Sequence, residues 1–89
     1  MPEMIQLEKE IHWDGEHLSV WAVTPKNRVR CEIPRETIHR IRLYSDAITR
    51  EIARDKEEII EHLRPSVIAK VAAAAGLSVR LQPSDLTDI

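Results

Sequence analysis

The chain has 89 residues, of which 43% are hydrophobic and 31% charged, and its formal net charge is −2 at pH 7. This length predicts one domain over residues 1–89, with the composition of a folded rather than a disordered protein. The slightly acidic total argues against a domain devoted to coating nucleic acid. Because the chain has no Phe, two Trp and one Tyr, we expect an aliphatic core.

The single cysteine excludes an internal disulfide, so the fold does not need an oxidising compartment. The first residues lack the charged start and apolar run of a secretory signal. The longest apolar run, Val71 to Ala75, is too short to span a bilayer. We therefore expect a cytoplasmic protein with no membrane partner.

Residues 5–13 and 17–24 alternate apolar and polar side chains, which predicts two half-buried strands. Asp14-Gly15 lies between them and favours a two-residue hairpin turn. With that turn, the apolar side chains of both strands fall on one face. The predicted pairs are Ile11 with Leu18 and Leu7 with Ala22.

Pro25-Lys26-Asn27 predicts a second turn. Residues 28–33 then alternate again, with Val29, Cys31 and Ile33 on the buried side. Together the three strands form a predicted antiparallel meander. Pro34 ends the third strand and supplies a helical φ for the residues that follow.

Three helices are expected after the meander. The first covers about 34–43, and Ser45 caps the second, which breaks or kinks near 62–64 because of Pro65. The third runs to Ala75, where Gly76 is a C-terminal stop. The predicted inward side chains are Ile38, Ile41, Ile48, Ile52, Ile59, Leu63, Val67, Ile68, Val71, Ala72 and Ala75.

Leu77, Val79 and Leu81 alternate with Ser78 and Arg80, which predicts a last strand. The expected fold is α+β, in the order β-β-β-α-α-α-β. It has a mostly antiparallel sheet with the helices packed on one face. The sequence does not fix the place of the last strand within that sheet.

The order of motifs resembles a family of short bacterial proteins known only as a domain of unknown function. The similarity rests on a Trp-containing first hairpin, on the segment 31–36 (CEIPRE) followed by a charged helix, and on the segment 79–86 (VRLQPSDL). The resemblance implies a compact α+β fold and no agreed activity. It supplies no catalytic residue.

The densest basic stretch follows the second turn. Its arginines and the start of the first helix predict an anion or nucleic-acid site, because free N–H groups there favour negative charge. The alternative is a solvated face partly neutralised by Glu32 and Glu36, and the stretch lacks interleaved aromatic residues and a Gly-rich loop. The candidate anion-binding residues are Arg30, Arg35, Arg40 and Arg42.

A second candidate site lies on the outer side of the sheet. Trp21 and Val23 point away from the helix-covered face, and Arg28 and Arg30 share their side. One interpretation is a contact surface, since Trp and Arg are favoured at interface centres, with a homodimer as one form of it. The other is a Trp lying under Arg side chains in an isolated domain.

Catalytic and metal chemistry receive less support. His12 and His17 are predicted to face each other across the first hairpin, but a structural metal site needs four ligands. The acidic group with His62 lacks zincin or di-iron spacing and is interpreted as a solvated helix face. Cys31 has the parity of a core residue and no definite His partner.

These observations lead to one functional hypothesis and one alternative. We expect a non-enzymatic protein-interaction or regulatory module with a protein partner or a second copy as its ligand. The alternative is a weak nucleic-acid or anion binder that uses the surface from Arg28 to Arg42. No catalytic residue, cofactor or metal is predicted, because no acid, base and nucleophile converge in the sequence.

Overall fold

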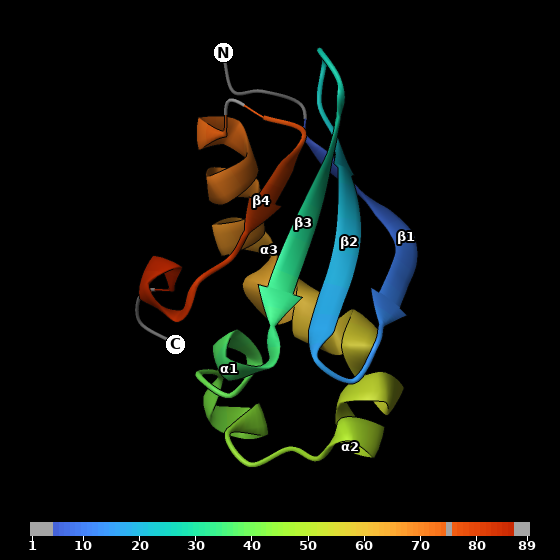
Figure 1. Ribbon diagram of the computed structural model, residues 1–89, viewed down its shortest axis with the longest axis vertical. Helices are drawn as coiled ribbons and strands as arrows, with labels where there is room; N and C mark the ends of the chain where they lie inside the picture. Colours follow the sequence, from blue (N-terminus) through green and yellow to red (C-terminus); the bar gives the residue numbers. More distant parts are fainter. Residues whose placement is uncertain (1–4, 75, 87–89) are drawn as a thin grey trace.

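In the computed structural model, which describes residues 5–74 and 76–86, four strands form one sheet in the order β1-β2-β3-β4 (Figure 1). The first three are antiparallel neighbours, and the last pairs with β3 in parallel. The predicted α+β fold and its mostly antiparallel sheet are confirmed. The strands are β1 (Gln6–Trp13), β2 (His17–Val23), β3 (Arg28–Pro34) and β4 (Ser78–Arg80).

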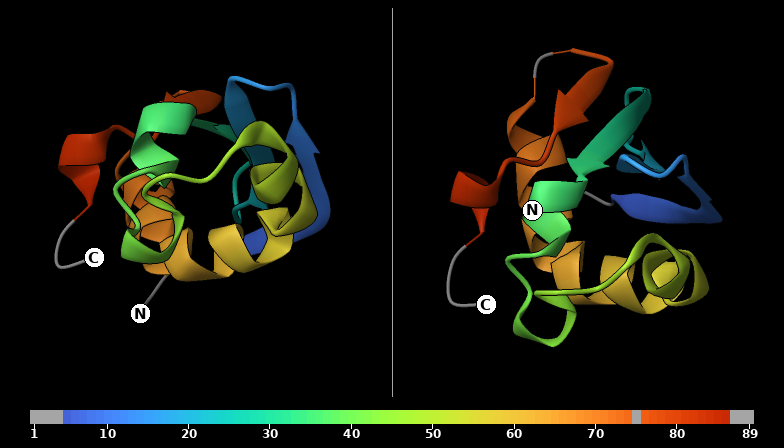
Figure 2. Two further views of the ribbon diagram at one scale, coloured as in Figure 1. Left: turned by 90° about the horizontal axis from the view of Figure 1, so that it is seen from below. Right: turned by 60° about the horizontal axis from the view of Figure 1, so that its bottom comes forward.

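One of the described helices covers a face of the sheet, as predicted. The longest, α3, crosses behind the sheet in Figure 1, and the two short ones lie at its lower end. The turned views of Figure 2 show the same separation, with the other sheet face uncovered by any described helix. The helices are α1 (Arg35–Ile38), α2 (Thr49–Arg54) and α3 (Lys56–Ala73), with short 3-10 turns η1 (Arg42–Tyr44) and η2 (Pro83–Asp85).

The first hairpin forms, but its predicted register is only partly right. Leu7 pairs with Ala22 as expected, whereas Ile11 pairs with Val20, two residues beyond its predicted partner. The cause is an irregularity in β1 between Leu7 and Ile11. Lys9, the charged residue that interrupts the inward row, lies in this irregular part and is exposed. The irregularity therefore keeps a lysine out of the core and preserves the parity of the strand.

The turn of this hairpin is also displaced. Gly15 has φ of +95°, a conformation that favours glycine. Asp14 Oδ1 accepts hydrogen bonds from the backbone N–H groups of Glu16 at 2.8 Å and His17 at 2.7 Å. The backbone N–H of Asp14 donates to the carbonyl of His17 at 3.2 Å. The turn is thus centred on Gly15-Glu16, one residue later than predicted.

The first predicted helix, over 34–43, is wrong in length. α1 is one turn long, and Ile41 then adopts an extended conformation with φ −76° and ψ 122° before η1 begins. Ile38, Ile41 and Tyr44 are all buried. The extended residue redirects the chain, so that both Ile41 and Tyr44 reach the core.

Ser45 does not cap the second helix, which begins instead at Thr49. The backbone N–H of Ile48 donates to Glu51 Oε1 at 3.0 Å, which satisfies a free group at this end. Ile48 is 50% exposed, so its predicted place in the buried stripe is wrong.

Pro65 does not end a helix, because α3 continues through it, and the interruption lies instead at Asp55 between α2 and α3. Pro65 lies inside α3, although a proline removes one backbone hydrogen bond from a helix. The predicted break at this proline is therefore wrong.

The core is aliphatic, as expected. Thr37 is a fully buried exception, and its hydroxyl donates to the carbonyl of Leu81 at 2.7 Å, which joins α1 to the segment after β4. Ala72 is exposed, against prediction, and Ala75 lies outside the described residues. The fully buried side chains include Leu18, Val20, Cys31, Ile33, Ile38, Ile52, Ile59, Leu63, Val67 and Leu81.

Candidate interaction surface on the open sheet face

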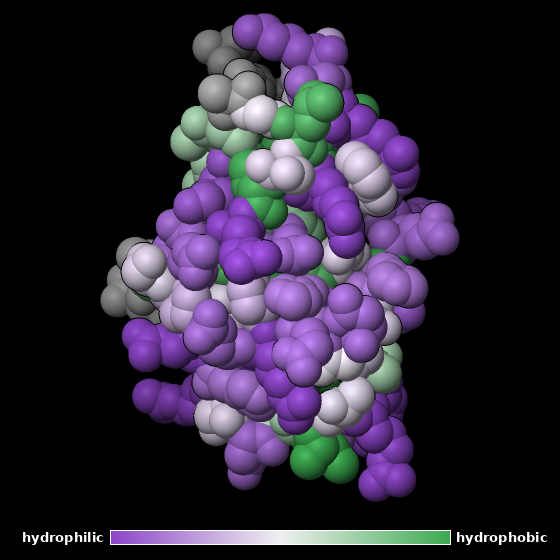
Figure 3. Space-filling view, viewed as in Figure 1, coloured by the Kyte–Doolittle hydropathy of each residue, from purple (hydrophilic) through white to green (hydrophobic). Residues whose placement is uncertain are grey.

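The sheet face opposite α3 carries the outward side chains of all four strands, and we call it the open face. Figure 3 shows the molecule from this side, where most of the surface is hydrophilic. The alternation of the strands puts charged and hydroxyl side chains beside one tryptophan and one valine. The residues of the open face include Glu8, Ser19, Trp21, Val23, Arg28, Arg30, Glu32, Ser78 and Arg80.

Trp21 lies half-buried under an arginine. The guanidinium carbon of Arg28 is 4.2 Å from the centroid of the indole ring. Arg28 is held there by Glu8, to which it donates from Nε at 2.5 Å and from Nη2 at 2.8 Å. These hydrogen bonds lower the pKa of Glu8 below its usual range. Val23, on the same strand as Trp21, is 43% exposed.

A second arginine–carboxylate pair joins β3 to β4. Arg80 donates to Glu32 Oε1 from Nε at 3.0 Å and from Nη2 at 2.7 Å. The parallel register places Arg80 beside Glu32 and Ser78 beside Arg30. His17 Nε2 lies 4.0 Å from the same oxygen of Glu32. Glu32 is therefore already engaged on two sides.

Arg30 differs from its two arginine neighbours. It is exposed, and its cross-strand partner is Trp21. Within the described part of the chain, its side chain makes one hydrogen bond, from Nη2 to the hydroxyl of Ser19 at 3.3 Å, and no ion pair within 4.0 Å. Beside it is a hollow of about 290 Å³, lined by Arg30, Glu32, Ser78, Val79 and Arg80.

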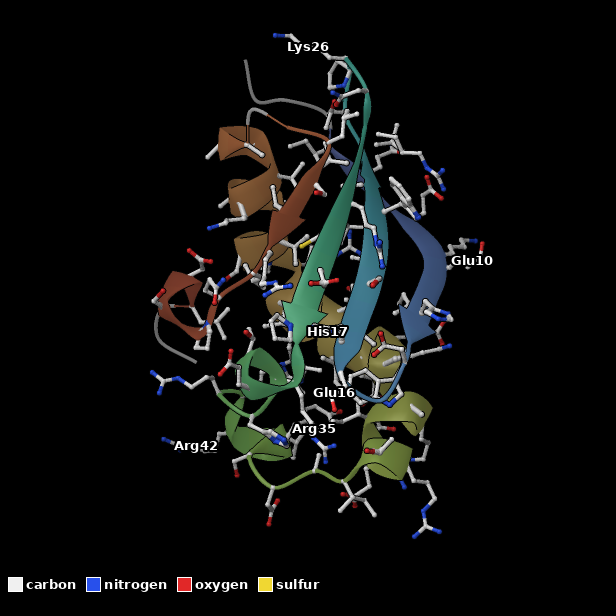
Figure 4. The ribbon with its side chains drawn as sticks, in the orientation of Figure 1. Glu10, Glu16, His17, Lys26, Arg35 and Arg42 are labelled. Atoms are coloured by element: carbon white, nitrogen blue, oxygen red, sulfur yellow. The ribbon has the colours of Figure 1, made fainter. Side chains whose placement is uncertain are left out.

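The other candidate anion-binding residues lie elsewhere. Arg35 donates from Nη1 to the hydroxyl of Thr49 at 2.9 Å and from Nε to Nε2 of His39 at 3.2 Å, so it ties α1 to the first residue of α2. Arg40 and Arg42 are exposed beyond α1, and Figure 4 shows Arg42 directed away from Arg35. The structure therefore does not gather these three with Arg30.

The predicted facing of His12 and His17 is wrong. His12 pairs with Ser19, and His17 pairs with Pro34 on the other side of β2. The irregularity in β1 causes this change, because it moves every pair near the turn by two residues. Within 5–74 and 76–86, no group of three or more His, Cys, Asp or Glu side chains is arranged to hold a metal ion.

Two further interpretations concern single elements. Cys31 is fully buried, and burial raises the pKa of its thiol to about 12, as expected of a core residue rather than a reactive thiolate. Glu57, Glu58, Glu61 and His62 are exposed along α3, which agrees with a solvated helix face.

Five of these members of the open face were not among the predicted site residues: Ser19, Glu8, Glu32, Ser78 and Arg80. The parity of Ser19 with Trp21 was an available signal for the first. The two residues of β4 had none, because the sequence did not place this strand beside β3. Their position follows from the parallel pairing alone.

Comparison of the chain with protein-family models, curated proteins and solved structures gave no match. The resemblance to a bacterial family of unknown function therefore stays a prediction. Among the described residues, no helix combines the length and the apolar character needed to cross a membrane.

Proposed function

We propose that this protein is a non-enzymatic interaction or regulatory module of the cytoplasm that docks a protein partner on the open face. The observation that carries the proposal is an indole and a 43% exposed valine side by side on a sheet face that is otherwise polar. Large aromatic and arginine side chains are favoured at the centres of protein interfaces. A sheet face presents them on a rigid support.

The alternative, weak nucleic-acid or anion binding, receives less support from the positions of the arginines. Arg35 already donates hydrogen bonds to Thr49 and His39, and Arg42 points to another side of the molecule. Phosphate binding benefits from several cations on one surface, because each neutralised phosphate adds to affinity. The open face instead mixes arginines with carboxylates.

The proposal is tested by affinity capture from the source cell with the full chain as bait. Trp21→Lys places a charge at the centre of the open face, and Ile48→Lys makes the same change at a half-exposed apolar residue before α2. We expect one protein to be retained by the wild type and by Ile48→Lys and to be lost with Trp21→Lys. Equal retention by the two variants would contradict the assignment of the surface.

Light scattering on the free protein tests whether the partner is a second copy of the chain. A dimer mass for the wild type that falls to a monomer mass in Trp21→Lys would identify the second copy as the partner. A monomer mass in both proteins leaves a different protein as the partner. Circular dichroism on each variant controls for loss of fold.

A further inference from the structure

We infer that the open face takes an acidic segment of a partner protein, whose carboxylate binds Arg30 while an apolar side chain packs against Val23, beside the covered Trp21. The inference rests on the proposed function and adds the chemistry of the partner. Arg30 and Trp21 are direct cross-strand neighbours, so one short segment reaches both.

The charges of the open face support an acidic ligand. Arg28 is bound by Glu8, and Arg80 is bound by Glu32, so each carboxylate of the face already holds one arginine. Arg30 is the third guanidinium, and the hydroxyl of Ser19 offers it no charge. A guanidinium binds a carboxylate through two parallel, charge-assisted hydrogen bonds, which makes this group the natural complement.

The surroundings of Arg30 leave room for that group. The hollow of about 290 Å³ beside it opens between β3 and β4, and Ser78 contributes to its lining. Ser78 is the register partner of Arg30 on β4. A carboxylate in the hollow therefore meets the guanidinium groups of Arg30 and Arg80 and the hydroxyl of Ser78, beside the Glu32 carboxylate that Arg80 already binds.

A second copy of the chain fits this face less well. Packing two open faces together brings two sets of surplus positive charge into contact, while Glu8 and Glu32 are already engaged. Glu10, the nearest other acid of β1, points away from the sheet in Figure 4. Like charges opposed at an interface weaken association.

A nucleic acid also fits less well. Arg28 covers the indole of Trp21 at 4.2 Å, so this ring is not free for a base to stack on. A row of phosphates would cross both Glu8 and Glu32, whereas a single carboxylate at Arg30 faces only Glu32, whose charge Arg80 already offsets. An acidic peptide with an apolar residue satisfies Arg30 with one carboxylate and does not need a row of cations.

An NMR titration of the labelled full chain tests the inference. The probe is a capped five-residue peptide with two glutamates on either side of a leucine, and the matched peptide has lysines in place of the glutamates. We expect shifts on β2, β3 and β4 with the acidic probe alone. Arg30→Gln should weaken binding about tenfold, which corresponds to the loss of one charge-assisted hydrogen bond. Arg42→Gln, an exposed arginine outside the face, should leave binding unchanged.

Three results would overturn the inference: no binding of the acidic probe to the wild type, equal binding of the basic probe, or equal losses in Arg30→Gln and Arg42→Gln. A fourth is tighter binding of a short oligonucleotide through Arg30, which would assign the face to nucleic acid. If Trp21-dependent capture of a partner succeeds and the acidic probe fails, the interaction module stands and its acidic partner does not. If both fail, the open face is not a docking surface.

Discussion

The two faces of the sheet come from the same strands and have opposite physical character. On the covered face, Val20, Cys31 and Ile33 are at most 1% exposed. On the open face, their neighbours Trp21, Arg30 and Glu32 keep contact with solvent. The covered face therefore accounts for the stability of the domain. The side chains of the open face are not needed for the core and can be suited to a ligand. The same chemical change should therefore have different effects on the two faces.

The largest expected contrast is in chemical reactivity on the covered face. Cys31 is fully buried, and burial raises the pKa of its thiol to about 12. Labelling by a thiol reagent should be on the order of a thousandfold slower in the native protein than in denaturant, because reaction needs an opened molecule. Stopped-flow or mass-spectrometric labelling measures this, and fast native labelling would place Cys31 outside the core.

The thiol of Cys31 also predicts how the stability of the protein changes at alkaline pH. Because its pKa is raised in the folded protein, its contribution to stability is complete below the unfolded value of about 8.5 and is lost as the pH rises towards about 12. The free energy of unfolding of the wild type should fall between pH 9 and pH 11 more steeply than that of Cys31→Ala. Parallel slopes would argue against a protonated core thiol.

The next contrast uses one substitution on both faces of β2. Val20 is 1% exposed, and Val23 is 43% exposed. Val20→Ala should lower the free energy of unfolding by about 2 kcal/mol, from lost burial and a small cavity. Val23→Ala should change it by no more than about 0.5 kcal/mol. Urea unfolding measures both, and the shared loss of β-branching cancels in the difference. Similar losses would mean that the open face is also a packed face.

The contrast between the faces was largely visible in the sequence. A period of two over residues 28–33 assigned Val29, Cys31 and Ile33 inward and the arginines outward, and each strand kept its parity in the structure. Even the wrong register in the first hairpin did not invert a face, because the irregularity before Ile11 moves the pairs by two residues. Side-chain alternation therefore survived an error in pairing.

The parts that failed depend on contacts between distant segments. The parallel place of β4 beside β3 follows from the path of α3 across the sheet, and local pattern carries no trace of it. Without that placement, the pair of Glu32 with Arg80 and the isolation of Arg30 are not deducible. The helix boundaries failed for a related reason: burial of Ile41 and Tyr44 overrides local helix propensity. The basic stretch from Arg28 to Arg42 is continuous in the sequence. Because the chain leaves the sheet after β3, its arginines lie in different parts of the structure.

The smallest expected effect concerns the cover over Trp21. Arg28 lies 4.2 Å from the centre of the indole and is fixed by Glu8. Arg28→Ala should uncover the ring, so that its fluorescence shifts to the red and acrylamide quenches it more strongly, while the unfolding midpoint hardly moves. The measurement uses a Trp13→Phe background, in which only Trp21 emits.

Arg50→Ala, an exposed arginine of α2, is the matched control and should leave the emission unchanged. Arg28 is held by the Glu8 carboxylate and by the ring of Trp21, and protonation of Glu8 weakens the first of these contacts. Because the pKa of Glu8 is lowered in the folded protein, the cover should persist at pH values where an ordinary glutamate is already half protonated, and should loosen only below them. If quenching is the same with and without Arg28, the arginine does not cover the ring. The indole would then be free for stacking, and the argument against a nucleic-acid ligand would lose its basis.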